Sequence, residues 1–524
     1  MRRGNPWVVL VTLCLGFFMT LLDLTIVNVA MPSMLETLHA TLDDILWVVS
    51  GYTIALAVLL ITAGRLGDMW GRRNMFAAGV ALFTLASVAC GLAPSAEWLI
   101  AARVVQGAGA AVLMPQTMAI IVATFPAERR GAALGVWGAV AGLATIAGPT
   151  VGGALVSWAG WRWIFYLNVP VGLVVLVMAL TLVPDVRHGG RQRLDLPGVL
   201  LASAGLVAVT FALVEGERYD WGRIWSFVSV PLLGVAGLAL LGAFVWHQAR
   251  RQDKQPLVPF SLFRDRNFAL MNGVGVIMSV GLIGGMLPLT IYLQSVLGHT
   301  ALQAGLIMAP MAVVNMLLSP LVGRLSDQVG GKFILMGGLA LYGGGLAWTV
   351  LVADVGTAWP ALLPGLVVAG AGMAGMFIPL QALAMYHVPP PLAGAASGLV
   401  NTTRQLGSAL GAAVVGALMQ NRLAASIAHE AATRAPALPA SARGEFRDAL
   451  AALSAGARPV AGLPGDVART ARDVFVHGFT GSLVPTMALP VGAMLAAAAL
   501  CFAVQGKERP RQPTPAPATP ARSR

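Results

Sequence analysis

The sequence predicts an all-α integral membrane protein in which fourteen helices cross the bilayer. Of its 524 residues, 57% are hydrophobic and only 11% are charged, a balance that excludes an ordinary soluble protein. Apolar runs of about 20 residues, each long enough to cross a bilayer core of roughly 30 Å, recur along the whole chain. The net charge of +12 comes from basic residues between these runs, so we expect contact with the lipid bilayer and no nucleic-acid partner.

The predicted spans follow one another from residue 7 to residue 503. The first run is followed by many more, so we interpret it as a transmembrane helix and not as a cleaved signal peptide. The spans are 7–29, 45–63, 74–92, 98–121, 132–156, 163–183, 197–214, 226–247, 268–294, 303–323, 333–353, 359–385, 394–419 and 480–503.

The distribution of Lys and Arg predicts the orientation. With the N-terminus inside, 22 of the 34 basic residues fall in inner segments and three in short outer loops. Seven more lie in one long outer loop, and long loops follow the positive-inside rule weakly. Arg103 and Arg404 lie within spans. We therefore expect a multi-pass membrane protein with both termini cytoplasmic. Because Arg outnumbers Lys 31 to 3 and Ala is plentiful, the composition suggests a GC-rich bacterial genome, so we expect the bacterial cytoplasmic (inner) membrane.

The spans group into predicted domains. Residues 1–185 form an N-terminal six-helix bundle, 186–255 contain two additional linking helices, and 256–505 form a C-terminal six-helix bundle. Within the last, residues 420–479 are expected to be a long polar outer loop with helical pieces around Asn421–Arg434 and Gly465–His477. Residues 506–524, rich in Pro and Arg, are expected to be a disordered cytoplasmic tail.

Two inner loops repeat one pattern at a constant offset of 259 residues, which predicts a transporter with two similar halves. A single loop of this kind is equally well explained as an ordinary positive-inside loop. Two loops at the same offset disfavour that explanation. The glycines permit a tight turn, the Asp can lie at a neighbouring helix N-terminus, and the Arg pair can bridge to a carboxylate or to anionic lipid. The matched residues are Gly64, Arg65, Leu66, Asp68, Gly71 and Arg73 in one loop, with Arg72 beside them, and Gly323, Arg324, Leu325, Asp327, Gly330 and Lys332 in the other.

Together with three further motifs, these loops resemble the major facilitator superfamily, specifically its fourteen-helix drug:proton antiporters. The loops are similar to the superfamily's inner-loop motif, although Met69 stands where that motif usually has a basic residue. The run 22–32, the sequence Gly148-Pro149-Thr150-Val151-Gly152-Gly153 and the run 161–170 are similar to signatures of the group. The resemblance implies a major facilitator fold, with two six-helix bundles plus two extra linker helices.

Asp23 is the carboxylate placed deepest in a predicted span, and it is the main candidate for coupling. It lies about 16 residues after Trp7, or roughly 24 Å along an outward-running helix. Arg103, near the start of the inward-running fourth span, falls at a similar depth. Charged residues inside membranes usually pair or line a water-filled cavity, so we expect a direct or water-bridged contact. A purely structural pair is the alternative. The resemblance implies that Arg103 takes part in proton transfer.

Other residues are candidates for a substrate cavity or for conformational change. Gly148-Pro149 predicts a bend in the fifth span, with Gly152 and Gly153 offering a face for close packing. The alternative is a generic Gly/Pro kink of a membrane helix, without a functional role. Arg404 lies near mid-depth without an evident acidic partner, so it either binds a polar or anionic group or satisfies helix carbonyls. The remaining cavity candidates are Asn28, Gln106 and Gln405.

The leading functional hypothesis is a proton-coupled antiporter that exports amphipathic or cationic drugs, driven by the proton gradient without a cofactor or metal. One alternative is a dedicated exporter of one endogenous metabolite or antibiotic, serving self-resistance. The other is a membrane receptor that does not transport. No enzyme is expected, because no nucleophile–base arrangement is evident. We expect a monomer whose partners are a small-molecule substrate, protons and lipid, with a periplasmic adaptor left open.

Overall fold

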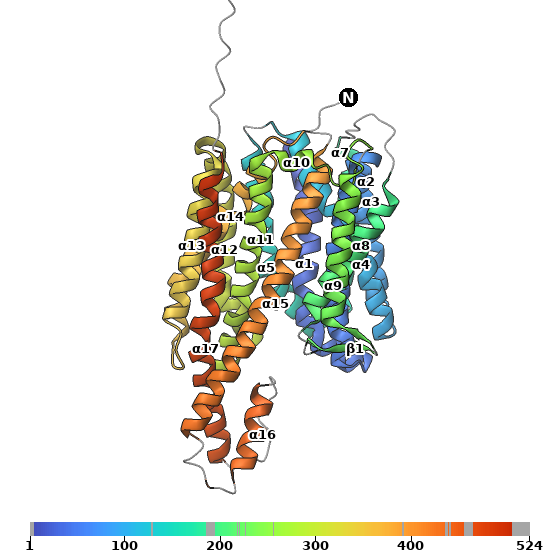
Figure 1. The fold of residues 1–524 in the computed structure, drawn as a ribbon. Coiled ribbons are helices and arrows are strands. Elements are labelled where there is room, and N and C mark those ends of the chain that lie inside the picture. Colours follow the sequence, from blue (N-terminus) through green and yellow to red (C-terminus); the bar gives the residue numbers. More distant parts are fainter. Residues whose placement is uncertain are drawn as a thin grey trace, which may run out of the picture.

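The fold is a bundle of long helices that run nearly side by side (Figure 1). The computed structural model describes residues 5–126, 129–184, 194–216, 218–219, 221–225, 227–254, 256–389, 392–434, 439, 442–454 and 465–505. Within these residues, thirteen helices are long and apolar enough to cross a membrane. The fifth predicted span corresponds to α5 (Arg130–Ala159), a 30-residue helix of which some side chains lie outside the described part.

The helices of the first six predicted spans appear in the expected order. Two of them begin at recognisable N-caps. At the start of α1 the side chain of Asn5 accepts a hydrogen bond from the Trp7 amide, and Pro6 is the first helical residue. At the start of α2 Thr41 and Asp44 form a capping box. The helices are α1 (Pro6–Leu38), α2 (Leu42–Trp70), α3 (Arg72–Gly91), α4 (Ala96–Thr124), α5, and the pair α6 (Trp163–Tyr166) and α7 (Asn168–Leu182) that together form the sixth span.

The two additional helices are α8 (Leu196–Glu215) and α9 (Val230–Ala249), which pack on each other. The helix of the eighth span begins slightly later than the approximate predicted start at residue 226. The chain first forms a small antiparallel hairpin, β1 (Arg223–Trp225) and β2 (Val228–Ser229), and the helix begins only at Val230. Ser229 caps it by accepting the Leu232 amide, and Pro231 follows at a position that tolerates proline. α8 lies against α2 and α15.

The helices of the last six predicted spans also appear in order. A short α10 (Ser261–Arg264) precedes them. They are α11 (Arg266–Ile291), continued by the π-helical turn η2 (Tyr292–Val296); α12 (Ala301–Val329); α13 (Gly331–Leu351); η3 (Trp359–Leu362) with α14 (Leu363–Ala384); α15 (Ala393–Arg434); and α17 (Gly465–Leu500), ending in the 3₁₀ turn η7 (Cys501–Ala503). The division into domains at 185, 255 and 505 stays a prediction.

The expected outer loop at 420–479 needs correction. The predicted helical pieces exist, but they are continuations of the membrane helices α15 and α17, which reach 42 and 36 residues. A third helix, α16 (Arg443–Ser454), packs on α17, and the three project beyond the rest of the bundle (Figure 1). Buried Ile427, Phe446 and Phe475 belong to this projection, which we call the outer extension. The tail 506–524 lies outside the described residues.

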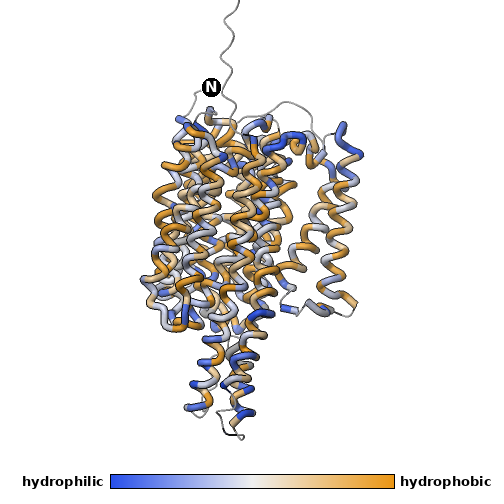
Figure 2. Tube along the Cα trace, turned by 60° about the vertical axis from the view of Figure 1, so that its left-hand side comes forward, coloured by the Kyte–Doolittle hydropathy of each residue, from blue (hydrophilic) through white to orange (hydrophobic). Residues whose placement is uncertain are grey.

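The two ends of the bundle differ in composition from its middle. Figure 2 shows apolar residues along the length of the bundle and hydrophilic ones gathered at its ends and on the outer extension. Large apolar side chains such as Leu85, Leu173 and Leu200 are exposed, as lipid contact requires. We call the end where α1 begins and α17 finishes the inner end, which the charge distribution predicts to face the cytoplasm. The opposite end, which carries the outer extension, is the outer end.

Candidate functional site

Asp23 of α1 and Arg103 of α4 form an ion pair inside the bundle. The Arg103 Nη1 donates to Asp23 Oδ2, and both side chains are buried, with 0% and 1% of their surfaces exposed. Both helices also contact one another along part of their length. The contact expected from the depth of the two residues is therefore present and direct. Either charge would cost considerable free energy at this buried position if it had no partner.

Two amides complete the shell around the carboxylate. Gln106, one helical turn after Arg103, donates through Nε2 to Asp23 Oδ1 at 2.9 Å and to Ser87 Oγ at 2.7 Å. Asn168, at the start of α7, donates to the same Asp23 Oδ1 at 3.3 Å. Gln106 Oε1 in turn accepts from Arg103 Nη1 at 2.7 Å. Side chains from α4 and α7 thus meet at the carboxylate on α1, and Ser87 of α3 accepts hydrogen bonds from both amides.

The guanidinium of Arg103 is held on its other sides as well. Its Nε donates to the carbonyl oxygen of Val48 at 3.1 Å, and its Cζ lies 4.2 Å from the ring centroid of Tyr52. Phe165 lies farther away, at 5.9 Å. The buried hydroxyl of Tyr52 has no hydrogen-bond partner in the described part of the chain. The aromatic faces stabilise the buried cation.

The buried guanidinium and the buried carboxylate compensate each other, so removal of either side chain would leave the other charge without its partner inside the bundle. Sequence reasoning had placed Gln106 in a substrate cavity, but here it is fully buried in the Asp23 shell. Asn168, Ser87 and Tyr52 were missed, because single polar residues in membrane helices usually only bond between helices.

At the inner end, the first copy of the repeated loop motif joins α2 to α15 through hydrogen bonds. Asp68 of α2 accepts from the backbone amides of Gly394 at 3.1 Å and Ala395 at 2.9 Å, in the first turn of α15. Arg72 donates to the same Asp68 at 3.1 Å and to the carbonyl oxygen of Ala119 at 3.2 Å. Asp68 therefore lies at the N-terminus of a neighbouring helix, where its negative charge is favourable.

Glycines allow the same helices to touch. A Cβ on Gly64 would overlap the carbonyl oxygen of Gly394, and one on Gly398 would lie 2.7 Å from the carbonyl oxygen of Leu60. The second loop repeats this crossing between α12 and α5. There a Cβ on Gly323 would overlap the carbonyl oxygen of Gly131, and one on Gly135 would lie 2.8 Å from that of Ser319. Leu60 and Ser319 are related by the same 259-residue offset as the loops.

The turns that follow both crossings are alike. Gly71 ends α2 and begins α3 with φ of 92°, and Gly330 does the same between α12 and α13 with φ of 96°. Only glycine adopts this conformation without strain. The side chain of Asp327, the counterpart of Asp68, lies outside the described residues. Arg73 makes interactions with its surroundings, and its counterpart Lys332 donates to the carbonyl oxygens of Phe502 and Val504 at the end of α17.

A comparison with protein families identifies this architecture. Residues 13–412 match the family model described as Major Facilitator Superfamily. The chain belongs to the major facilitator superfamily. It is 34% identical to the tetracenomycin C resistance and export protein of Streptomyces glaucescens over 99% of this chain and 96% of that protein. It is 37% identical to the multidrug resistance protein Stp of Mycobacterium tuberculosis over 79% and 76% of the two chains.

Among solved structures, the proton:xylose symporter XylE has the same overall fold. The two chains superpose with a TM-score of 0.59 over 96% of each, at 13% sequence identity. At that identity the likeness concerns the fold alone. Transporters of this superfamily generally need no cofactor. Among the described residues there is no group of three or more His, Cys, Asp or Glu that could hold a metal ion.

The motif in α5 of this superfamily member packs against α1, close to Asp23. A Cβ on Gly148 would overlap the hydroxyl of Thr25, and one on Gly152 would lie 2.6 Å from the Ile26 side chain. Thr25 Oγ1 also donates to the carbonyl oxygen of Ala144 at 3.3 Å. Gly153 faces open space instead. The side chain of Pro149 lies outside the described residues, and the predicted bend stays a prediction.

The remaining cavity candidates of this transporter fold lie apart from Asp23. Arg404 of α15 is partly exposed, and its guanidinium carbon lies 5.3 Å from the ring of Phe377 on α14. No acidic side chain among the described residues pairs with it. Gln405 is partly exposed beside it, and Asn28 only donates to the carbonyl oxygen of Leu24 at 3.2 Å. Their part in substrate binding stays a prediction.

Proposed function

We propose that this major facilitator protein is a proton-coupled exporter of amphipathic, antibiotic-type compounds. Its relatives named for tetracenomycin C export and for multidrug resistance support export as the direction and such compounds as the cargo. The observation that carries the proton coupling is the buried Asp23–Arg103 pair. Coupling needs a group that can exchange a proton for another partner, and Asp23 is placed to do so.

The proposed cycle uses this exchange. In the state described here the side chain of Asp23 is held by Arg103, Gln106 and Asn168. A proton that enters from the outer end neutralises Asp23, which frees Arg103 and loosens the contact of α1 with α4. The halves then rock, the inner end opens, and the proton leaves inward while substrate enters. Re-formation of the ion pair accompanies closure of the inner end and release of substrate outward.

The same proposal includes the setting of the protein. The inner end, held closed by the glycine crossings and Asp68, faces the cytoplasm of a bacterial cell, so that both termini are cytoplasmic. The protein works as a monomer and draws on the proton gradient alone. The basic residues of the inner segments support this orientation.

The deciding experiment measures proton release from purified protein when substrate is added. Wild-type protein should release protons in weakly buffered solution upon binding of an exported compound. The Asp23→Asn variant should bind without release and should show no export driven by a pH gradient in proteoliposomes. Asp44→Asn, which changes a partly exposed carboxylate in the capping box of α2, is the matched control. Export by Asp23→Asn at the wild-type rate would refute the proton role.

A second candidate, a dedicated exporter of one compound, gains support from Arg404. A cationic drug would have to compete with Arg103 for Asp23, whereas Arg404 and Phe377 present a cation and an aromatic face without an acidic partner among the described residues. Such a pair suits aromatic compounds that carry an ionised hydroxyl or carboxyl group. A susceptibility panel separates the two, since resistance to a single scaffold would replace the multidrug function. A non-transporting receptor is disfavoured by the complete Asp23 shell.

A further inference from the structure

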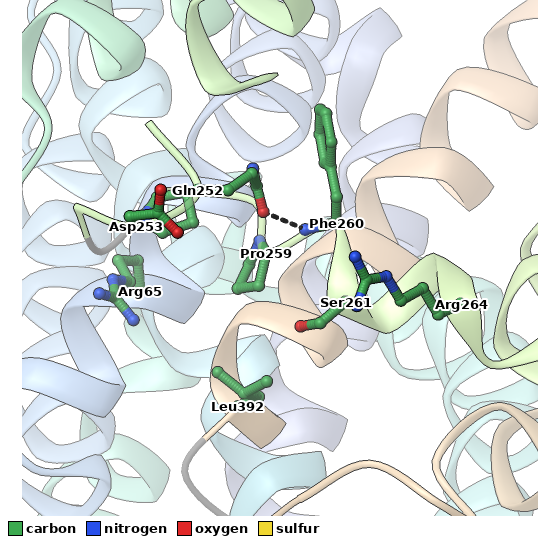
Figure 3. Close-up of a pocket in the computed structure, with 9 residues that line it drawn as sticks. Arg65, Gln252, Asp253, Pro259, Phe260, Ser261, Arg264 and Leu392 are labelled. Carbon is green, nitrogen blue, oxygen red and sulfur yellow. Dashed lines mark hydrogen bonds between the residues drawn. The ribbon is translucent and has the colours of Figure 1, made fainter. Parts of the chain in front are cut away.

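A pocket lies at the inner end of the bundle, separate from the Asp23 network. It encloses about 570 Å³, within the range of small-molecule sites. Figure 3 shows Arg65 and Asp253 on one side, Ser261 and Arg264 on the other, and Leu392 at the edge. Gln252, Pro256, Pro259 and Phe260 complete the wall. The lining therefore comes from α2, the segment after α9, α10, and the turn before α15.

Arg65 is the unusual member of this lining. Only 4% of its surface is exposed, yet no hydrogen bond or ion pair joins its side chain to any residue in the described part of the chain. Its neighbour Arg72, by contrast, is bound by Asp68 and by the carbonyl oxygen of Ala119. The charge of Asp68 acts on Arg65, and the guanidinium also lines the pocket, where it can bind an anion.

The rest of the lining indicates what kind of anion fits. Arg264 faces the same space and has no ion-pair partner among the described residues, while Asp253 is exposed at the opposite rim. A phosphate can bind one of these two guanidinium groups, and the other, on the opposite side of the pocket, can bind a further oxygen of the same ester. The single carboxylate favours hydroxyl groups next to that phosphate, because hydroxyls can donate to it. The prolines, Phe260 and Leu392 add apolar surface for a short carbon skeleton.

The wall formed by the segment after α9 is firmly held before any ligand arrives. Gln252 accepts the Phe260 amide at 2.7 Å and donates to the carbonyl oxygens of Gln248 and Val258 at 2.9 and 3.2 Å. Gln248 accepts the amides of Leu257 and Val258 at 2.8 and 3.2 Å. A wall fixed by its own hydrogen bonds loses little entropy on binding.

We propose that this pocket binds a phosphate ester with glycerol-like hydroxyl groups, and that binding holds the inner end closed. Arg65 lies one residue from Gly64, where α2 crosses α15, and Leu392 immediately precedes α15. Opening of the inner end would separate these walls, so a ligand that bridges them favours the closed state. The ester is either the headgroup of an anionic lipid in the inner leaflet or a free cytosolic phosphoester.

The repeat supplies a matched control. Arg324 occupies the position of Arg65 in the second loop, but it is exposed and does not line the pocket. Arg324→Gln therefore removes the same charge from the equivalent place. Arg65→Gln and Arg264→Gln test the site, and because Arg264 is exposed, its replacement leaves the bundle packing intact even if Arg65→Gln folds poorly.

The experiment compares thermal unfolding and ligand affinity of full-length protein in nanodiscs. One arm uses phosphatidylcholine alone, a second adds phosphatidylglycerol, and a third adds free glycerol 3-phosphate to phosphatidylcholine discs. We expect stabilisation in the second or the third arm. The affinity should fall about tenfold to a hundredfold in Arg65→Gln and Arg264→Gln, as expected for lost charge-assisted hydrogen bonds, and stay unchanged in Arg324→Gln.

The arms also identify the source of the ligand. Stabilisation by phosphatidylglycerol alone assigns the pocket to a lipid headgroup, and stabilisation by glycerol 3-phosphate alone assigns it to a soluble ester. A cysteine-reactive probe at the inner end should label the ligand-bound protein more slowly, and this slowing should disappear in Arg264→Gln. Equal stabilisation of wild type, Arg264→Gln and Arg324→Gln, or none in either arm, overturns the proposal.

Discussion

Gly64 of α2 lies against Gly394 of α15 with so little space that a Cβ at position 64 would overlap the carbonyl oxygen of Gly394. The same geometry recurs between Gly323 of α12 and Gly131 of α5. The inner end is therefore closed by two backbone-to-backbone crossings that the internal repeat relates. Close approach of this kind requires glycine, since the overlapped atoms belong to the backbone and cannot rotate away.

Gly64→Ala should push α2 away from α15 and shift the protein toward an open inner end. Overpacking costs roughly 1–3 kcal/mol, so the ratio of closed to open protein should fall about fivefold or more. Labelling of an engineered inner-end cysteine should become faster and export slower. Gly323→Ala should behave alike. Gly305→Ala, where a Cβ meets nothing within 4 Å, is the control; equal labelling of Gly64→Ala and wild type would contradict the expectation.

Arg103→Gln should destabilise the protein strongly, because Asp23 would remain buried without its cation. Removal of one partner of a buried pair typically costs about 3–5 kcal/mol. The double variant Asp23→Asn/Arg103→Gln removes both charges and should regain most of the lost thermal stability without regaining proton-coupled export. Unfolding midpoints of the single and double variants form the test. A double variant no more stable than Arg103→Gln would mean that the unpaired charge is not the cause.

Asp195, which precedes α8 at the inner end, should make the anchoring of the additional helices depend on pH. Burial raises its pKa, but hydrogen bonds from His247, Gln248 and the Gly198 amide, and the charge of His247, outweigh this and hold the pKa below its ordinary value. Arg251 also donates to it at 2.6 Å.

The sign follows from linkage. A lowered pKa in the folded state means that the ionised carboxylate stabilises the fold above its unfolded pKa of about 3.9, and that this contribution is lost as the pH falls through the folded pKa. The unfolding midpoint of wild-type protein should therefore fall more between pH 6 and pH 3 than that of Asp195→Asn. The difference between the two proteins should be largest at pH 6. A gap that widens toward pH 3 would contradict the assignment.

The effect of Arg404→Gln on export should depend on the charge of the substrate. Export of aromatic compounds with an ionised carboxyl or hydroxyl group should show a KM about tenfold or more higher, since one charge-assisted contact is lost. Neutral compounds of similar size should be affected little. Gln405→Ala, next to Arg404 and also partly exposed, controls for general disturbance of α15. Equal effects on charged and neutral compounds would show that Arg404 serves the helix and not the cargo.

The membrane helices could be predicted because the bilayer imposes one length and one composition on all of them. The predictions that needed correction concern segments outside the bilayer, where this constraint on length and composition does not apply. α15 and α17 continue far beyond the apolar runs, because Ala-rich polar sequence keeps its helix propensity after its hydropathy has fallen. The hairpin before Val230 was missed because Trp225 and Phe227 are apolar, and apolar character alone does not separate a short strand from a helix start.

Within the site, depth along each helix was enough to bring Asp23 and Arg103 together. It was not enough to find Asn168 or Ser87, since their contribution depends on which face of α7 and α3 turns toward Asp23. One signal could have been used for the helix crossings. Gly131 with Gly135, and Gly394 with Gly398, place two glycines four residues apart at the start of the fifth and thirteenth spans.

The outer extension gives the second half of the protein a lever arm. As a continuous helix of 42 residues, α15 is roughly 63 Å long, about twice the hydrocarbon thickness of a bilayer. A small tilt of this helix near the crossing at Gly394 becomes a much larger displacement at its far tip. A fluorophore attached at the tip would therefore report each small tilt of the helix as a larger displacement. The same relationship holds in reverse, so an antibody that binds the tip and restrains it should slow export.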